Sequence, residues 1–396
     1  MSHTCHAAYA ASRTWFRCVE VVLHSAYPHE FPPYEFADSL VLWLQSHDAE
    51  ARIIARGLPG AFMLHPDATS LFRNLRIAEL EVTTEGLGRE KSVLLLDNFR
   101  FLPALRSLRA DWCMLDGSLR ELSHLRSLES LTLEFCDVDV VPHALLSLPL
   151  LTALNLSQNC PMESQRWRES FRHVMPRLTG LQDLDLTYTF VEQHISLLTP
   201  LAASLTRLNL NGLSRGVEYG HLSRLSALRS FTACDTLPLS LSSLHVLTYL
   251  NLEGNEGLHV VPEVLSTLTT LKVLDLEYTG MDSGTEDFWN LRPLKQLQYL
   301  RLCSNRLASI SMNITALTAL THLDLSGNPL HSAADSWLHL MSLPLLKLLT
   351  VDINLYRRMH PRLYAHMGTG GRDICINSSF ASETETETTS DANSDM

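Results

Sequence analysis

The stretch LTTLKVLDLEYT at residues 268–279 carries the pattern that decides the fold, because the same order of leucines returns along most of the chain. It is legible again in LPLLTALNLSQN (148–159), LKQLQYLRLCSN (294–305) and LTALTHLDLSGN (317–328). In the central L-x-L, leucines alternate with a polar residue, as in Leu274, Asp275 and Leu276. A period of two is typical of a short strand with one buried face. We therefore expect one short strand in each repeat, with its leucines directed inward.

Twelve such pairs can be aligned, with spacings between 19 and 30 residues. Their first residues are Leu80, Leu108, Leu131, Leu154, Leu184, Leu208, Phe231, Leu250, Leu274, Leu300, Leu323 and Leu349. A unit of this length cannot bury its apolar face alone, so neighbouring units must stack. The third position after each pair is a polar slot, held by Asn159, Asn255, Asn305, Asn328 and Asn354, or by Cys113 and Cys136. An amide can serve backbone groups of the next unit, whereas a thiol fits as a small hydrophobe with a weak donor.

These repeats resemble the leucine-rich-repeat family over about residues 71–356. The segments VVPHALLSL (140–148) and VVPEVLSTL (260–268) are similar to the convex segment of its 23-residue intracellular class, found in Ras-group scaffolds and plant immune receptors. The resemblance implies an α/β repeat solenoid, a horseshoe with a concave parallel β-sheet and turns or short helices on the convex side. It also implies that proteins are bound through the concave strands.

Outside the repeats the chain divides into three further segments. Residues 1–70 lack the pattern, and FADSLVLWLQSHDAEARIIARGLPG (36–60) reads as two short helices, the second capped by Asp48 and ended by Gly57. We expect a helical N-terminal cap over the apolar end of the array, with a small adaptor or dimerisation module as the alternative. Residues 357–371 are basic and end in glycines, which indicates a C-terminal cap and a hinge.

The last segment, residues 372–396, is expected to be a disordered acidic tail. Its final part, ASETETETTSDANSDM, has five acidic residues and almost no apolar ones, so it cannot bury enough surface to fold. Ser382, Thr384 and Thr388 each precede an acid by three residues, a pattern that acidophilic kinases favour. Phosphorylation of this tail is a hypothesis.

Three repeats depart from the pattern. Phe231 and Ala233 stand where leucines belong, which indicates local curvature or a break. In the longest spacing, ESQRWRESFRHVM (163–175) places Trp167 and Phe171 at helical spacing, so we expect an amphipathic convex helix there. The segment SAADSWLHLM (332–341) is interpreted in the same way.

Charge is unevenly distributed over the expected strands. The positions before, between and after each leucine pair should face the concave side, and these 36 positions hold eleven acids and three arginines. A surface of one sign favours a partner of the opposite sign, so we expect a basic protein or peptide and not nucleic acid. The candidate partner-binding residues are Glu134, Asp183, Asp185, Tyr249, Glu253, Asp275, Glu277, Tyr299, Arg301 and Asp324. Tyr188 and Tyr278 either add aromatic anchors or pack inward. The bland alternative is that outward positions are polar anyway and that their sign is accidental.

The search for chemistry yields weak candidates. A phosphate loop is absent, and GLSRG (212–216) places Ser214 in a nucleophile pattern but outside the required strand-to-helix elbow. Zinc ligation by Cys5, Cys18, His24 and His29 matches no common spacing. A thiol nucleophile at Cys303 beside His322 is conceivable but a chance juxtaposition is favoured. We expect no catalytic residue, metal or cofactor.

Composition indicates the compartment. Eight scattered cysteines lack the clustered pairs of disulfide-capped arrays, and no long apolar segment or secretory leader is evident. We expect a cytoplasmic protein without a membrane span. The leading hypothesis is a non-enzymatic scaffold with an acidic concave face. The alternative is a substrate-recognition or sensor subunit of a ligase, phosphatase or immune complex, docking through residues 1–70.

Overall fold

The computed structural model describes residues 18–24, 50–56, 76–83, 92–116, 118–159, 164–189, 191–213, 219–233, 239–282, 289–330, 336–359, 361–368 and 371–377. The chain divides into two compact units, Met1–Leu205 and Thr206–Met396. We call them unit 1 and unit 2 and describe each by itself.

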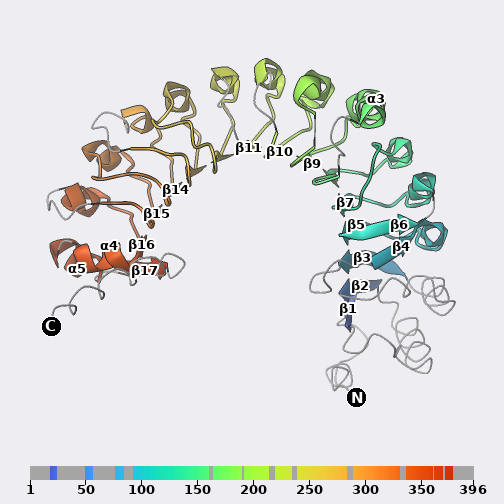
Figure 1. Cartoon of the computed structure of the whole chain (residues 1–396), viewed down its shortest axis with the longest axis horizontal. Helices are drawn as coiled ribbons and strands as arrows, with labels where there is room; N and C mark the ends of the chain where they lie inside the picture. Colours follow the sequence, from blue (N-terminus) through green and yellow to red (C-terminus); the bar gives the residue numbers. More distant parts are fainter. Residues whose placement is uncertain are drawn as a thin grey trace, which may run out of the picture. The chain divides into compact units, whose positions relative to one another are not determined.

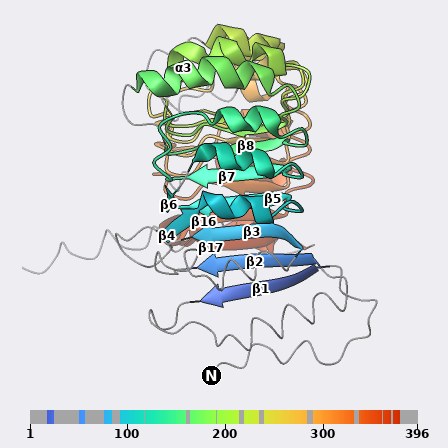
Figure 2. The ribbon, with the colours of Figure 1, turned by 90° about the vertical axis from the view of Figure 1, so that its right-hand side faces the viewer.

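Unit 1 contains a parallel sheet whose strands follow one another in chain order (Figure 2). Its strands are β1 (Cys18–His24), β2 (Glu50–Arg56), β3 (Ile77–Thr83), β5 (Ser107–Asp111), β7 (Ser130–Glu134), β8 (Ala153–Asn155) and β9 (Asp183–Asp185). A second, two-stranded parallel sheet joins β4 (Ser92–Leu95) to β6 (Cys113–Asp116). The connecting helices are η3 (Leu96–Phe101), η4 (Leu119–His124), η5 (His143–Ser147), α3 (Gln165–Val174), η6 (Met175–Arg177) and η7 (Glu192–Leu201), where η denotes a 3-10 helix.

Unit 2 repeats this arrangement. Its parallel sheet contains β10 (Arg207–Leu210), β11 (Ser230–Ala233), β12 (Tyr249–Asn251), β13 (Val273–Asp275), β14 (Tyr299–Arg301), β15 (His322–Asp324), β16 (Leu348–Asp352) and β17 (Asp373–Asn377). Its helices are η8 (Tyr219–Arg224), η9 (Leu239–Ser243), η10 (Glu263–Thr267), η11 (Trp289–Leu291), η12 (Met312–Ala316), η13 (Ser336–Ser342), α4 (Ile353–Arg358) and α5 (Pro361–Met367). In each unit the helices lie opposite the strands (Figure 1). This is the expected leucine-rich-repeat solenoid with a parallel sheet, and no described helix has the length and apolar character needed to cross a membrane.

The leucine pairs form the core between strands and helices. Leu274 and Leu276 are fully buried, and the pairing of β12, β13 and β14 aligns Leu250, Leu274 and Leu300. Burial of one aliphatic side chain contributes roughly 1.5–3 kcal/mol, so the stacked leucines supply most of the stabilisation. On the other side of the coil, Trp167 of α3 is buried, which confirms the expected amphipathic helix.

A ladder of buried polar side chains joins neighbouring repeats at the predicted polar slot. The Asn305 side chain accepts hydrogen bonds from the backbone N–H groups of Thr279 (3.1 Å) and Met281 (3.0 Å), and its Nδ2 donates to the Leu276 carbonyl (2.7 Å). In unit 1 the Cys136 thiol occupies the same slot and donates to the Ala110 carbonyl (3.2 Å). Amide and thiol therefore both tie a repeat to its predecessor, as expected from the sequence. Asn354 is the exception, because it lies in α4.

A left-handed turn ends the strand segment of most repeats. The residue two positions after the second inward residue has positive φ in nine repeats: Trp112 (56°), Phe135 (52°), Gln158 (60°), Tyr188 (50°), Gly212 (69°), Gly254 (78°), Tyr278 (53°), Ser304 (55°) and Gly327 (68°). This conformation directs its backbone N–H toward the next repeat, as in Trp112 to Glu134 O (2.9 Å) and Gly254 to Glu277 O (3.0 Å). A residue with a Cβ is disfavoured there by about 1–2 kcal/mol, a cost that glycine avoids.

The helical N-terminal cap is wrong in its second half. Residues 50–56 form strand β2 and not a helix, and β1 precedes it in the same sheet. In the pairing of β2 with β3, Ile53 lies beside Leu80. Backbone pairing along a seven-residue ladder outweighs the local helix signals at Asp48 and Gly57. The described part of 1–70 thus continues the sheet, and the first expected helix lies outside the described residues.

Two further expectations need correction. The sheet continues through β11 without a break, because Phe231 is buried and aligns with Leu208 and Leu250. The segment 373–377, assigned above to the tail, forms β17 and pairs with β16, with Ile374 beside Leu349. The remaining tail, with Ser382, Thr384 and Thr388, lies outside the described residues.

Candidate protein-binding surface

Each sheet has a face that points away from the helices, and we call it the open face. It is formed by the residues before, between and after each inward pair. Because neighbouring strands pair in register, these residues form rows across the strands. In unit 2 the row between the leucines is Asn251, Asp275, Arg301 and Asp324, and the row before them is Tyr249, Val273, Tyr299 and His322.

The residue between the leucines is an asparagine or aspartate in six repeats, and in all six its side chain makes the same turn. Its Oδ1 accepts a hydrogen bond from the backbone N–H two residues later: Asn155 (2.8 Å), Asp185 (2.9 Å), Asn209 (3.1 Å), Asn251 (2.7 Å), Asp275 (3.0 Å) and Asp324 (3.0 Å). Such a side-chain turn requires an acceptor oxygen and no charge. The negative charge of Asp185, Asp275 and Asp324 is therefore not needed by the turn that each one forms.

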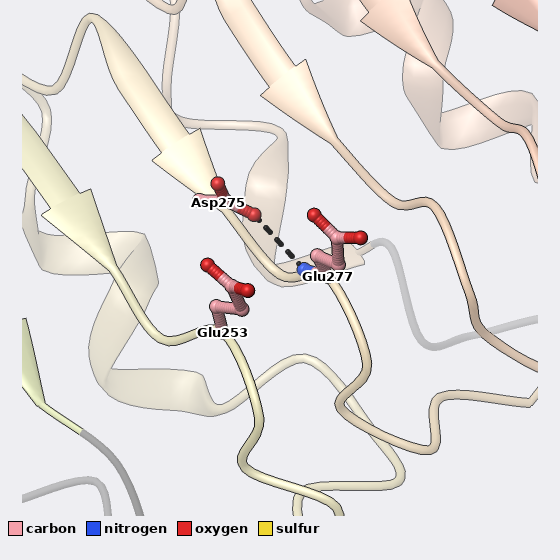
Figure 3. Close-up of side chains that lie close together, drawn as sticks. All are labelled: Glu253, Asp275 and Glu277. Atoms are coloured by element: carbon pink, nitrogen blue, oxygen red, sulfur yellow. Dashed lines mark hydrogen bonds between the residues drawn. The ribbon is translucent and has the colours of Figure 1, made fainter. Parts of the chain in front are cut away.

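In unit 2 four of the candidate residues gather into one cluster. The carboxylates of Glu253, Asp275 and Glu277 lie within 4.8 Å of one another, on the ends of two adjacent repeats (Figure 3). Arg301 reaches them from β14, and its Nη1 lies 3.0 Å from Asp275 and 3.3 Å from Glu277. Asp275 is buried, whereas about half of the Arg301 side chain is exposed.

The electrostatics of this cluster favour a charged arginine. Burial opposes the charge on Arg301, but the hydrogen bond to Asp275 and the charges of Asp275 and Glu277 raise its pKa above the ordinary value. Three carboxylates thus face one guanidinium, and two of the three already contact it. The arrangement suits partial charge compensation on a protein surface, and we assign no metal ion to it.

Aromatic residues accompany this cluster. The Tyr299 ring stacks on His322 at a centroid distance of 4.1 Å and an interplanar angle of 11°, and Tyr299 is 43% exposed. Tyr249 lies in the same row and is half-buried. Asp324 pairs in register with Arg301. The unit 2 candidates therefore lie on one continuous part of the open face.

In unit 1 the remaining candidates lie on the open face near the carboxyl ends of their strands. Glu134 ends β7, and Asp183 and Asp185 flank the inward leucine of β9. Burial raises the pKa of the Glu134 carboxyl, and so do the nearby charges of Asp111 and Asp185, against the opposing effect of Arg109. Arg109 is held by Asp111, with 2.6 Å between Nε and Oδ2. Unit 1 therefore has its own acidic region.

Two positions counted on the acidic face serve the fold. Asp352 is buried at the end of β16, where its Oδ1 accepts from the backbone N–H groups of Asn354 (2.8 Å) and Leu355 (2.9 Å) and so caps α4. Its Oδ2 accepts from Gly327 (2.9 Å). Cys303 was placed on the face by its parity but is buried, and burial together with the charges of Asp324 and Glu277 raises the pKa of its thiol. A thiolate nucleophile is therefore disfavoured there, and Ser214 and the zinc candidates Cys5 and His29 lie outside the described residues.

The aromatic residues at the left-handed turns are exposed. Tyr188 is 52% and Tyr278 is 54% exposed, so the alternative that they pack inward is wrong. Trp112, which the sequence did not single out, is 46% exposed and stacks on Phe135 at 4.0 Å. Parity fails at these positions because the left-handed residue leaves the strand geometry. A signal was nevertheless present, since glycine fills the same position in other repeats.

No family model matches the chain. Among curated proteins it is 36% identical over 110 residues to the alpha subunit of geranylgeranyl transferase type 2 from Bos taurus, a match that spans 27% of this chain and 18% of that protein. It is 31% identical over 186 residues to the CD180 antigen of Mus musculus (38% and 28%), and 34% identical over 100 residues to the transforming growth factor beta activator LRRC33 of Danio rerio (23% and 14%). The chain thus spans less than a third of the length of these relatives.

Solved structures with a similar fold cover more of the chain. An internalin from Listeria monocytogenes matches with a TM-score of 0.59 at 18% identity, over 86% of this chain and 93% of that one. A leucine-rich-repeat protein of Leptospira interrogans matches with a TM-score of 0.55 at 18% identity, over 83% and 78%. These likenesses support the leucine-rich-repeat assignment at the level of fold. The 23-residue intracellular class stays a prediction.

Proposed function

We propose that this chain is a non-enzymatic protein-interaction module that binds a basic protein or peptide through the carboxylates of its open faces. Repeat solenoids generally use such extended sheet surfaces for binding. A cluster of carboxylates on a protein surface attracts lysine and arginine and repels phosphate. The proposal therefore excludes nucleic acid as the partner of these faces.

One observation carries the proposal. Asn155, Asn209 and Asn251 form the same turn as Asp185, Asp275 and Asp324 with the same geometry. Aspartate in three of these repeats adds charge that the turn does not use. This argues against an accidental sign at positions that only need to be polar.

The test removes charge without changing the turn. In the double variant Asp275→Asn and Asp324→Asn, the acceptor oxygen stays and two charges go. A matched control removes two exposed charges away from the open face, with Glu169→Gln on α3 and Glu263→Gln on η10. Proteins captured from a cell lysate by each full-length chain are quantified by mass spectrometry at low and moderate salt.

We expect basic partners to be retained by the control and depleted about tenfold by the open-face variant, since two surface charge contacts contribute about 0.5–1 kcal/mol each. The difference should shrink at higher salt because exposed charges are screened. Equal capture by both variants at both salt concentrations would show that the carboxylates of the unit 2 open face do not bind the partner.

The adaptor alternative has weaker support. It needs a docking module in residues 1–70, yet both described segments of that region, 18–24 and 50–56, are strands of the unit 1 sheet. Cytoplasmic location remains part of our proposal, and it is supported by Cys113 and Cys136. These two buried thiols lie close together as free thiols, each donating to a backbone carbonyl.

A further inference from the structure

The left-handed turns of unit 1 present aromatic rings where the backbone would prefer glycine. Trp112, Phe135 and Tyr188 have φ values of 56°, 52° and 50°, and the equivalent positions of unit 2 include Gly212, Gly254 and Gly327. The hydrogen bond made by the turn is the same in both cases, because it uses the backbone N–H. The rings are therefore not required by the turn.

Nor are two of these rings required by the core. Trp112 is 46% and Tyr188 is 52% exposed. Trp112 lies flat against Phe135, with 4.0 Å between ring centroids and 15° between ring planes. A bulky residue in a disfavoured conformation with its ring in solvent is better suited to contact a partner than to stabilise the fold.

Carboxylates lie directly beside these rings. Asp111 precedes Trp112 and Glu134 precedes Phe135, and the two acids pair across β5 and β7. The charges of both Asp111 and Asp185 act on the Glu134 carboxyl. Negative charge and aromatic faces therefore share the carboxyl edge of the unit 1 sheet. A cation that approaches this edge can be attracted by both, because ring faces carry negative potential.

We propose that Trp112, Phe135 and Tyr188 form a cation–π edge that binds the arginine side chains of an extended basic peptide segment. Arginine fits better than lysine because its planar guanidinium can stack on a ring and still donate to Glu134. The turns of Phe135 and Tyr188 are two repeats apart, or about 10 Å at the usual spacing of strands. In an extended peptide this corresponds to basic residues about three positions apart. The inference rests on the proposed function and narrows its partner.

The test uses a fluorescein-labelled peptide of ten residues with arginine at every third position, and a second peptide with neutral citrulline at those positions. Binding to the full-length chain is followed by fluorescence anisotropy. Tyr188→Gly and Trp112→Gly install the residue that other repeats carry at this turn. Gln158→Gly is the matched control, because it changes the same turn in the intervening repeat without removing a ring.

We expect each aromatic variant to lose about threefold to thirtyfold in affinity for the arginine peptide, whereas Gln158→Gly keeps it. The citrulline peptide should bind weakly to every chain. Equal affinity of the parent and both aromatic variants would overturn the proposal, and so would equal affinity for the two peptides. A fall in the melting temperature of Tyr188→Gly would assign the ring to the fold and would also overturn it.

The result separates this inference from the proposed function. If Asp185→Asn weakens binding of the arginine peptide while Trp112→Gly and Tyr188→Gly do not, the acidic face stands and the aromatic edge is wrong. If only the aromatic variants weaken binding, the edge stands and the carboxylate of Asp185 is not part of it.

Discussion

The two units solve one backbone problem with different residues. In unit 1, three of the four left-handed turn positions are aromatic, namely Trp112, Phe135 and Tyr188. In unit 2, three of the five described ones are glycine, namely Gly212, Gly254 and Gly327. Both sets donate the same N–H to the following repeat. The comparison teaches that where the backbone does the structural work, the side chain is available for another use.

The polar ladder shows the reverse case, in which the side chain itself does the work. Asn305 in unit 2 makes hydrogen bonds through both ends of its amide, whereas Cys136 in unit 1 donates only weak thiol hydrogen bonds. The two positions should therefore differ strongly in their tolerance of substitution.

The largest expected effect follows from that difference. Asn305→Ala should destabilise unit 2 by about 2–4 kcal/mol, because it leaves several buried backbone groups unsatisfied. Cys136→Ala should cost unit 1 only about 1 kcal/mol, since a small apolar group is replaced by a smaller one. Urea unfolding followed by circular dichroism measures both. Asn305→Cys is the control and should recover part of the loss; equal costs at the two positions would contradict the comparison.

The turn between the leucines should distinguish oxygen from charge. Asp275→Ala removes the acceptor for the Glu277 N–H and one partner of Arg301, so we expect a loss of about 1–3 kcal/mol in the free energy of unfolding. Asp275→Asn keeps the acceptor, and Glu277 still contacts Arg301, so its cost should be less than half as large. Should Asn and Ala prove equally damaging, the charge of Asp275 would be structural and the basis of the proposed function would fail.

Exchanging turn residues between the units tests the comparison directly. Gly254→Tyr should destabilise the chain by about 1 kcal/mol, because it brings a Cβ to a φ of 78°. Tyr188→Gly should leave stability unchanged or raise it slightly. Thermal unfolding of the two single variants provides the measurement. A stabilising Gly254→Tyr would mean that aromatic rings at this position support the fold.

The smallest effect concerns pH. Burial raises the pKa of Glu134 in the folded chain, so its ionised form is disfavoured there. The resulting loss of stability is present above the folded pKa and disappears below the unfolded value. Glu134→Gln should therefore raise the urea midpoint slightly at pH 7 and not at pH 3. A variant that is less stable than the parent at neutral pH would reverse this sign.

The sequence was sufficient for the repeating part of the fold. The leucine pairs located the strands from β3 to β16, and the spacing of Trp167 and Phe171 located α3. It failed at β2, because EARIIAR has helix-forming residues and a plausible cap at Asp48, and only pairing with β3 decides for a strand. Long-range pairing of this kind leaves no local signal.

The candidate surface was only partly predictable. Parity placed Asp275, Glu277 and Tyr299 correctly on the open face, but it could not show that Arg301 draws two carboxylates together. Parity also misplaced Cys303 and left Tyr188 undecided, because positions after the second leucine belong to the turn. The recurrence of asparagine and aspartate between the leucines was readable as a side-chain turn and was missed.

The hydrogen bonds between repeats all point one way along the chain. The N–H groups of one turn are accepted by the repeat that follows, as for Trp112 on Glu134, Cys136 on Asn159 and Leu307 on Asn328. While the protein is being synthesised, the newest turn therefore waits for partners that have not yet left the ribosome. Structure should advance from the amino terminus with a lag of one repeat, and the segment after the last leucine pair, α4 to β17, closes that open end.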